Sequence, residues 1–519
     1  MQGNRWKRDL DLSTLIETLF RSRRSQLFLF LIASLATRIS AFGDTNYFGD
    51  ELLYFVIGQR MHDGLLPYVD IWDRKGPGLF LIYYGIAGIS HSVLAYQLAA
   101  TVCAALTGLA VNMIAERFAQ RPGALLAGLF YIVMLPLFGG GGGQAPVFYN
   151  LFMALAALGV VSQLPMLDAG RARVPLYCAM ASAGFAITFK QTAGFEGAFF
   201  GCFALWRLWR AGSSPGRILS HGCGLALAGA APILLFAGFY AATGHFAEFW
   251  HALITSNVQK IYNPGGDAWR RLSALAILAS PLLLPALPSL FLLRGKHAHA
   301  IPRAWLCGWL LAALAGFACL PNFIDHYTLP LLLPLAVSAA PALEWRRIGP
   351  TYAGFALLLV FLTGPATQFA KHRASRQAME LLAAEIRSRD PHPRLFIYQG
   401  PVFLYALLDS YPPSPLLYPP HLFHVPERNT SHLDTASETQ RILAWKPTVV
   451  LKVPGFAGQY LNRETAQMVD DYLTHCQLWS KREVIDYYAP YRVEIYGNCL
   501  WPADTIGKSP AQISPVSSD

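Results

Sequence analysis

The sequence predicts a polytopic α-helical membrane protein with about eleven spans and a small α/β domain outside the membrane. Hydrophobic residues make up 54% of the 519 positions, charged residues only 14%, and the apolar residues gather in long runs. Soluble proteins contain about a quarter charged residues, so this balance favours a membrane class. The formal net charge of +10 is divided among short clusters between the apolar runs, which is typical of membrane proteins rather than of nucleic-acid binders.

The apolar runs give the expected number of spans. A spanning helix needs about 20 apolar residues. Proline and glycine blur the boundaries of the runs, so the count of about eleven carries an uncertainty of one or two. The runs begin at Leu27, Ala95, Gly123, Phe148, Leu176, Ala193, His221, Leu272, Ala304, Tyr327 and Thr351.

Positive charges predict how the spans are oriented. Basic residues precede the first span and recur in every second loop, as the positive-inside rule requires. The N-terminus is therefore expected in the cytoplasm, and an odd number of spans places the C-terminal part outside. The basic clusters lie at 5–24, 117–121, 171–173, 207–217, 294–303 and 346–347, and the loops expected outside are 44–75, 139–146, 243–271 and 321–326.

Four parts follow from this organisation. Residues 1–24 are a basic cytoplasmic segment without the features of a cleavable signal peptide. Residues 25–370 form the transmembrane module, with an informative first outer loop at 43–78. Residues 371–502 are expected to form the outer α/β domain, and the tail 503–519 is expected to be disordered. The α/β prediction rests on an amphipathic stretch at 377–387 and strand-like runs at 395–398, 448–453, 484–486 and 491–496.

The cysteines show no metal-binding spacing. Six of the eight lie in apolar segments, where they are expected to be small buried hydrophobes. Cys476 and Cys499 lie in the polar C-terminal part. They can form one disulfide if that part faces an oxidising compartment, and two free thiols are the alternative.

Charged residues are concentrated in the first outer loop. Residues 52–61 are expected to form an amphipathic helix along the membrane surface. Asp50 would begin this helix, so an acidic N-cap is the structural explanation for it. A cap requires neither Glu51 nor a second polar cluster, and dense charge beside a bilayer usually marks a site, so we favour a function. The second cluster is Tyr68, Trp72, Asp73, Arg74 and Lys75.

Two other features of the outer loops have structural interpretations. The run Gly139 to Gly143 lacks the Lys-Ser/Thr of a phosphate loop and is expected to be a flexible linker, with a mobile lid as the alternative. The aromatic residues of the first loop are expected to anchor it at the membrane interface. They are Tyr47, Phe48, Tyr54, Phe55, Tyr68 and Trp72.

The first loop resembles that of bacterial GT-C glycosyltransferases of the family 39-like type, which are related to dolichyl-phosphate-mannose protein mannosyltransferases and to lipid A aminoarabinose transferases. The shared order is Gly-Asp-Glu, a helix, and then Gly-x-x-Pro-Tyr-x-Asp-x-Trp-Asp-x-Lys-x-Pro. Segments 189–191 and 325–327 and the C-terminal domain extend the likeness to nearly the whole chain. The second outer loop departs from it, because relatives often have a carboxylate there and this chain has none. The matching residues are Asp50, Glu51, Gly64, Pro67, Tyr68, Asp70, Trp72, Asp73, Lys75 and Pro77.

The resemblance implies a GT-C-type fold and an inverting glycosyltransferase. Such an enzyme moves a sugar from a polyprenyl-phosphate donor to a hydroxyl of a glycan, lipid or protein acceptor at the outer face of the bacterial inner membrane. This chemistry demands no cofactor or metal, although divalent-metal dependence stays open. A transporter or flippase of polyprenyl-linked glycans is the alternative, and a polysaccharide polymerase or ligase fits less well. Sugar, acceptor, carrier lipid and oligomeric state do not follow from the sequence.

The resemblance also assigns residue roles. Asp50 is the expected base for the acceptor hydroxyl, and Glu51 is expected to orient the acceptor or Asp50. The lipid phosphate leaves as an anion and needs fixed positive charge, for which Lys75 is the first candidate and Arg74 the second.

Five further residues are expected to bind substrate. A lone lysine in an apolar run is costly, so Lys190 is expected to meet the substrate phosphate, with an ion pair to Glu196 as the alternative. The remaining expected substrate-binding residues are Asp44, Tyr68, Asp73 and His326.

Overall fold

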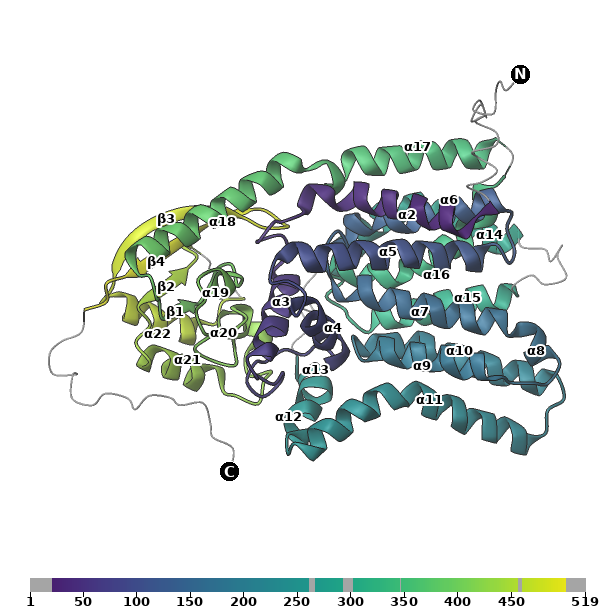
Figure 1. Cartoon of the computed structure of the whole chain (residues 1–519), viewed down its shortest axis with the longest axis horizontal. Coiled ribbons are helices and arrows are strands. Elements are labelled where there is room, and N and C mark those ends of the chain that lie inside the picture. Colours follow the sequence, from purple (N-terminus) through teal and green to yellow (C-terminus); the bar gives the residue numbers. More distant parts are fainter. Residues whose placement is uncertain (1–20, 261–266, 293–301, 346, 456–459, 501–519) are drawn as a thin grey trace, which may run out of the picture.

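Long helices run side by side through most of the chain, and the C-terminal part forms a separate unit at one end of them (Figure 1). The structure is a computed structural model that describes residues 21–260, 267–292, 302–345, 347–455 and 460–500. Most of the expected cytoplasmic segment 1–24, most of the basic cluster 294–303 and the tail 503–519 lie outside the described residues.

The first half of the chain contains the outer loop and the first helices of the bundle. After α2 (Arg23–Arg38) and the turn η1 (Ile39–Ala41), the first outer loop holds α3 (Gly49–His62) and leads into α4 (Pro77–Ala87). The bundle continues with α5 (Val93–Ala115), α6 (Arg121–Met134), η2 (Leu135–Phe138), α7 (Ala145–Ser162), α8 (Leu164–Asp168), α9 (Val174–Ile187), η3 (Gln191–Ala193), α10 (Gly194–Arg210) and α11 (Pro215–Ala242).

Further helices complete the bundle. A short segment after α11 consists of α12 (Phe246–Trp250), the π-turn η4 (His251–Thr255) and α13 (Ser256–Gln259). The helices that follow are α14 (Ala268–Leu292), α15 (Arg303–Ala318), η5 (Asp325–Leu331), α16 (Leu332–Leu343), α17 (Ile348–Thr363) and η6 (Pro365–Thr367).

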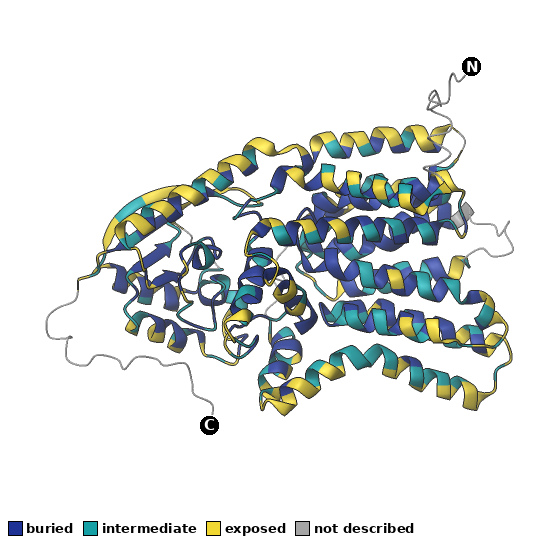
Figure 2. Cartoon of the chain, in the orientation of Figure 1, coloured by how far each residue is buried: buried dark blue, intermediate teal, exposed yellow. Residues whose placement is uncertain are grey.

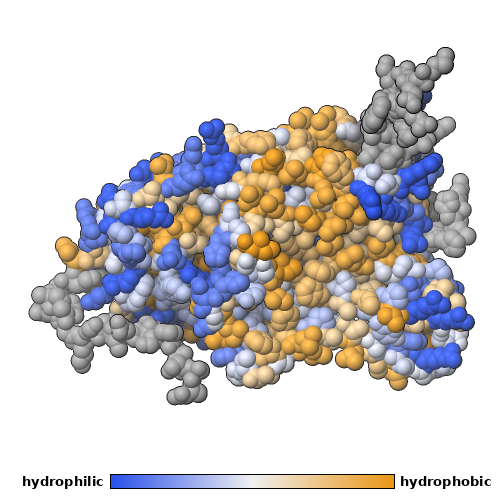
Figure 3. Space-filling model, viewed as in Figure 1, coloured by the Kyte–Doolittle hydropathy of each residue, from blue (hydrophilic) through white to orange (hydrophobic). Residues whose placement is uncertain are grey.

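The helical bundle confirms the membrane class. Each apolar run identified in the sequence lies on one of these helices, and apolar side chains form a broad band over the bundle (Figure 3). Within the described residues, six helices are long and apolar enough to span a membrane, and α4, α9, α15 and α17 are shorter apolar helices. The count of eleven spans stays a prediction. The six are Val93–Ala115, Arg121–Phe138, Ala145–Ser162, Pro215–Ala242, Ala268–Leu290 and Asp325–Leu343.

The C-terminal unit is the small α/β domain that the sequence predicts. Helix α18 (Phe369–Arg389) leads from the bundle to a four-stranded sheet of order β1-β2-β4-β3, in which only β1 and β2 are parallel. The strands are β1 (Leu395–Ile397), β2 (Val449–Lys452), β3 (Gln477–Ile485) and β4 (Pro490–Gly497). The helices of this domain are α19 (Leu404–Leu407), α20 (Pro420–Phe423), η7 (Val425–Glu427), α21 (Thr435–Ala444) and α22 (Arg463–Leu473).

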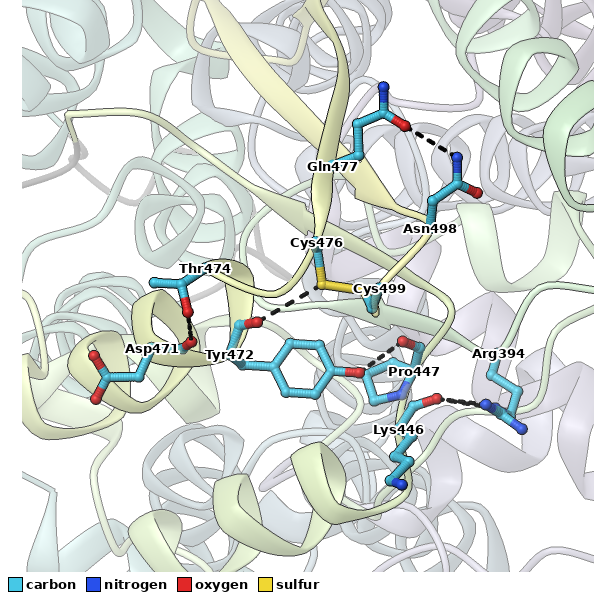
Figure 4. The surroundings of a disulfide bond; sticks show 10 residues. All are labelled: Arg394, Lys446, Pro447, Asp471, Tyr472, Thr474, Cys476, Gln477, Asn498 and Cys499. Atoms are coloured by element: carbon cyan, nitrogen blue, oxygen red, sulfur yellow. Dashed lines mark hydrogen bonds between the residues drawn. A yellow bond between two sulfur atoms is a disulfide. The ribbon is translucent and has the colours of Figure 1, made fainter. Parts of the chain in front are cut away.

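One disulfide links the two antiparallel strands at the edge of this domain. Cys476 and Cys499 are bonded, which joins the residue before β3 to a residue just after β4 (Figure 4). Beneath it the Tyr472 hydroxyl donates to the Pro447 carbonyl oxygen at 2.8 Å. The other six cysteines are free and none is buried within the protein, so the expectation that they are buried hydrophobes is wrong. Cys103 and Cys307 are partly buried against the core, and Cys178, Cys202, Cys223 and Cys319 are exposed.

Helix α3 forms where the sequence predicts it, but in a different environment. It is buried from Glu51 to Gly58 because it is wedged between the bundle and the C-terminal domain (Figures 1 and 2). The prediction of an amphipathic helix on the membrane surface is therefore wrong. The aromatic residues of the loop are buried as well, from Tyr47 to Trp72, so they fill the interior of the protein and do not anchor the loop at the membrane interface.

Candidate functional site

A cavity of about 690 Å³ opens between the first outer loop and the C-terminal domain. The loop supplies Asp50 and the run Asp73 to Lys75. The domain supplies the turn after β1, at 399–402, and the segment around α20 and η7, at 418–427. His326, at the start of η5, also lines the cavity. The cavity therefore gathers most of the charged residues that the sequence singles out.

Asp50 lies in the first turn of α3, but its carboxylate does not cap the helix. Phe48 is the N-cap residue and makes no side-chain capping bond. The Asp50 carboxylate instead accepts hydrogen bonds from the hydroxyls of Tyr418, at 2.9 Å, and Tyr54, at 3.2 Å. Burial acts to raise the pKa of Asp50, but the Lys75 ammonium, His326 and the two tyrosines lower it to about 2. Asp50 is therefore a fixed anion in the wall of the cavity.

Lys75 is the cation closest to this carboxylate. Its Nζ lies 3.5 Å from Asp50 Oδ2 and 5.1 Å from the centre of the Tyr54 ring. Burial acts to lower the pKa of Lys75, but Asp50 and Asp73 raise it above its usual value. Asp73 also fixes the backbone, because its Oδ1 accepts from the Lys75 amide at 3.0 Å. Asp50, Asp73 and Lys75 thus form one charged group, as expected.

Glycines on both sides of Pro77 hold Lys75 in place. The amides of Gly76 and Gly78 donate to the carbonyl oxygens of Phe189 and Thr188, at 3.2 and 3.0 Å. A Cβ at position 76 would stand 2.0 Å from the Thr188 oxygen, so only glycine allows this approach. The loop is thereby tied to the segment that carries Lys190.

Glu51 points away from the cavity, into the glycine run of the second outer loop. Its side chain is fully buried, and a Cβ on Gly142 would lie 2.1 Å from its Oε2. Gly139 to Gly143 are all buried, and Gly143 accepts a hydrogen bond from Tyr83 at 2.7 Å. The run is a packed cradle for Glu51, so the predictions of a flexible linker and of a mobile lid are both wrong. Burial raises the pKa of Glu51 to about 8.

Arg74 pairs with a residue that the sequence analysis missed. Its Nη2 lies 2.8 and 2.7 Å from the two carboxylate oxygens of Glu427, in the C-terminal domain. Lys260, which follows α13, lies 2.9 Å from Glu427 Oε1. Burial acts to raise the pKa of Glu427, but Arg74 and Lys260 lower it to about 2. All three residues line the cavity.

Lys190 and His326 are the two expected substrate-binding residues that come from the helical bundle. The Lys190 ammonium lies 3.8 Å from the centre of the Tyr327 ring. Its expected alternative partner, Glu196, instead accepts from Trp309 Nε1 at 2.6 Å. The His326 ring packs edge-on against Phe48 at 5.9 Å between ring centres.

Three expected substrate-binding residues, Lys190, Asp44 and Tyr68, do not line the cavity. Asp44 accepts from His372 Nδ1 at 2.9 Å and from Ser375 Oγ at 2.7 Å, which ties the outer loop to α18. Tyr68 is fully buried under the loop, and its hydroxyl donates to the Lys75 carbonyl oxygen at 2.8 Å.

The described residues contain no candidate metal-binding cluster. Within them, no group of three or more His, Cys, Asp or Glu side chains is arranged to hold an ion.

Sequence comparison relates the chain to two bacterial transferases. Both are named undecaprenyl phosphate-α-4-amino-4-deoxy-L-arabinose arabinosyl transferase and are 27% identical. The Pseudomonas paraeruginosa protein matches over 327 residues, which are 57% of this chain and 55% of the relative. The Pseudomonas aeruginosa protein matches over 364 residues, 64% of this chain and 62% of the relative. The chain thus matches somewhat over half the length of these relatives. No protein-family model matches the sequence.

Comparison with solved structures finds a similar transferase fold. The crystal structure of ArnT from Cupriavidus metallidurans bound to undecaprenyl phosphate covers 90% of this chain and 97% of its own, with a TM-score of 0.57 and 16% identity. Its apo form has the same coverage and TM-score with 15% identity. The chain therefore shares the fold of the ArnT structure, and both comparisons agree with the resemblance carried by the first outer loop.

Proposed function

We propose that the chain is an inverting glycosyltransferase that transfers a sugar from a polyprenyl-phosphate donor to a hydroxyl acceptor. The observation that carries the proposal is the pair of Asp50 and Lys75, 3.5 Å apart in the wall of a cavity beside the bundle. A general base and a fixed cation are the two groups that this displacement needs. The relatives named for undecaprenyl-phosphate-linked aminoarabinose support a lipid-linked donor.

The proposed step is a single displacement. Asp50 takes the proton of the acceptor hydroxyl as its oxygen attacks the anomeric carbon, and the bond from that carbon to the donor phosphate breaks. The electron pair of this bond stays on the lipid phosphate, whose charge Lys75 and Arg74 neutralise. His326 lines the cavity and contacts the donor, whereas Lys190 lies outside the lining and would have to reach the donor phosphate from beside Tyr327, which does line it. Glu51 supports Asp50 indirectly by holding α3 in place.

Donor binding also activates the base. Without donor, Lys75 keeps the pKa of Asp50 near 2, which makes Asp50 a weak base. A phosphate bound to Lys75 offsets the positive charge that Asp50 experiences. The pKa of Asp50 then rises toward the range in which a carboxylate removes a proton effectively.

The proposal places the cavity at the outer face of the bacterial inner membrane. It includes the predicted topology, with about eleven spans in residues 25–370, a cytoplasmic N-terminus and a periplasmic domain at 371–502. The Cys476–Cys499 disulfide supports an oxidising location for that domain. The acceptor is a glycan, lipid or protein in that compartment.

The test is transfer from a panel of radiolabelled polyprenyl-phosphate sugars to membrane extracts by purified wild type and Asp50→Asn. The matched control is Asp409→Asn, because the Asp409 side chain is 95% exposed and asparagine tolerates its positive φ of 48°. We expect transfer from one donor, its loss in Asp50→Asn and its retention in the control. Transport of labelled lipid across proteoliposomes without transfer from any donor would instead identify a flippase.

A further inference from the structure

Arg74, Lys260 and Glu427 come from three distant parts of the chain and meet in the cavity. Arg74 belongs to the first outer loop, Lys260 follows α13, and Glu427 ends η7 of the C-terminal domain. Their side chains are 14%, 12% and 11% exposed, respectively, so the contacts lie in a largely dehydrated place. Ion pairs that are sheltered in this way are screened much less by salt than surface pairs.

One carboxylate here serves two cations. Both nitrogen atoms lie within 2.9 Å of Glu427 Oε1, so Glu427 occupies the point at which the positive charges converge. Two buried cations without an anion would repel each other and remain uncompensated. The pair is therefore a preformed anion site that Glu427 fills.

The proposed reaction creates a stronger anion than the one it consumes. The donor is a phosphodiester with a single negative charge. When the bond to the sugar breaks, the carrier leaves as a phosphate monoester, whose second pKa of about 6 gives it nearly two negative charges at neutral pH. The product consequently binds the cations of the cavity more tightly than the donor does, and its departure becomes the harder step.

We propose that Glu427 is a positioning residue that competes with the lipid phosphate for Arg74 and Lys260 and so speeds release of the spent carrier. This inference rests on the proposed function. When the phosphate binds, the two cations turn toward it. When it leaves, Glu427 takes them back, so that the cations never stand uncompensated.

The test measures binding of undecaprenyl phosphate to the purified full-length protein, together with single-turnover and steady-state transfer. Glu427→Gln keeps the shape of the side chain and removes its charge. We expect this variant to bind undecaprenyl phosphate about tenfold more tightly than wild type, the effect of losing one competing charged hydrogen bond. Its first turnover should stay fast while later turnovers slow, so that a burst appears.

The matched control is Glu464→Gln in the same domain. Glu464 forms a surface ion pair with Arg428 at 2.7 Å, where both side chains are about half exposed, so its loss should leave binding and the burst unchanged. If Glu427→Gln does not fold, Glu427→Asp retains the charge at a shorter reach. That variant should bind undecaprenyl phosphate more tightly than wild type by a smaller factor.

Weaker or unchanged binding in a folded Glu427 variant would overturn the inference, because Glu427 would then only build the site. The experiment distinguishes failure of the Glu427 inference from failure of the proposed function. Wild type that transfers sugar while Glu427→Gln behaves identically refutes the competition alone. Wild type that neither transfers sugar nor binds undecaprenyl phosphate refutes the proposed function as well.

Discussion

Substitution of Gly142 by alanine tests whether the glycine run positions the base. The new Cβ would stand 2.1 Å from Glu51 Oε2 and 2.8 Å from its carboxyl carbon. Carbon atoms need separations of about 3.5 Å, so Glu51 and α3 must retreat by about 1 Å. Overpacking of this kind costs about 1–3 kcal/mol of the free energy of unfolding. Because Asp50 precedes Glu51, it moves too, and a 1 Å displacement costs about 100-fold in rate.

The assay compares kcat/KM and the thermal unfolding midpoint of Gly142→Ala with those of wild type. Gly142 does not have a positive φ, so the change measures space rather than backbone strain. Gly85→Ala in α4 is the control, because a Cβ there meets nothing within 4 Å. It should keep activity and stability, whereas Gly142→Ala should lose both. If Gly142→Ala keeps kcat/KM within twofold of wild type and its unfolding midpoint is unchanged, the glycine run adapts to the added methyl group. That result would refute the proposal that the run positions Glu51 and α3.

Two further predictions concern the site. Tyr418→Phe removes a hydrogen bond to Asp50 and should lower kcat/KM about tenfold. The control is Tyr398→Phe, which removes a buried hydroxyl contact elsewhere in the domain and should affect stability only. Equal losses of activity in the two variants would contradict the role of Tyr418. Glu51 keeps its proton in the folded protein up to about pH 8, while the unfolded chain releases it near 4.5. Wild type should therefore lose stability as pH rises between these values. The gain in unfolding midpoint of Glu51→Gln should grow across that window and stay constant above it, and a gain independent of pH would argue against a buried neutral acid.

Features that depend on neighbouring residues were predictable from the sequence. Hydrophobic runs located the bundle helices, and strand-like runs located β1, β2 and β4 of the C-terminal sheet but only the end of β3. Asp50, Asp73, Arg74 and Lys75 lie within 26 positions of one another, and the structure places all four in one cavity wall. Such a cluster can be predicted from the sequence because residues that are close in the chain, as in one short loop, are also close in space.

Contacts between distant segments were not predictable. Tyr418 meets Asp50 across 368 positions and Glu427 meets Arg74 across 353, and the Pro-rich turn at 418–420 was the only signal near either residue. The glycine run misled for a related reason. Its composition is that of a linker, but Glu51 of α3 and Tyr83 of α4 pack against it and decide its conformation. The loop aromatics also match both an interfacial anchor and a core, and only the covering C-terminal domain selects the core.

The cavity is lined by both the first outer loop and the C-terminal domain, and this has a consequence for biosynthesis. The chain emerges from the ribosome with Asp50 near its beginning and Tyr418 and Glu427 near its end. An incomplete chain has the proposed base but lacks the tyrosine that fixes it and the carboxylate that compensates Arg74. Under the proposed function and topology, the chemistry therefore starts only after the C-terminal domain has crossed the membrane, folded and docked. We therefore expect a protein that stalls during insertion to be unable to consume the proposed lipid-linked donor.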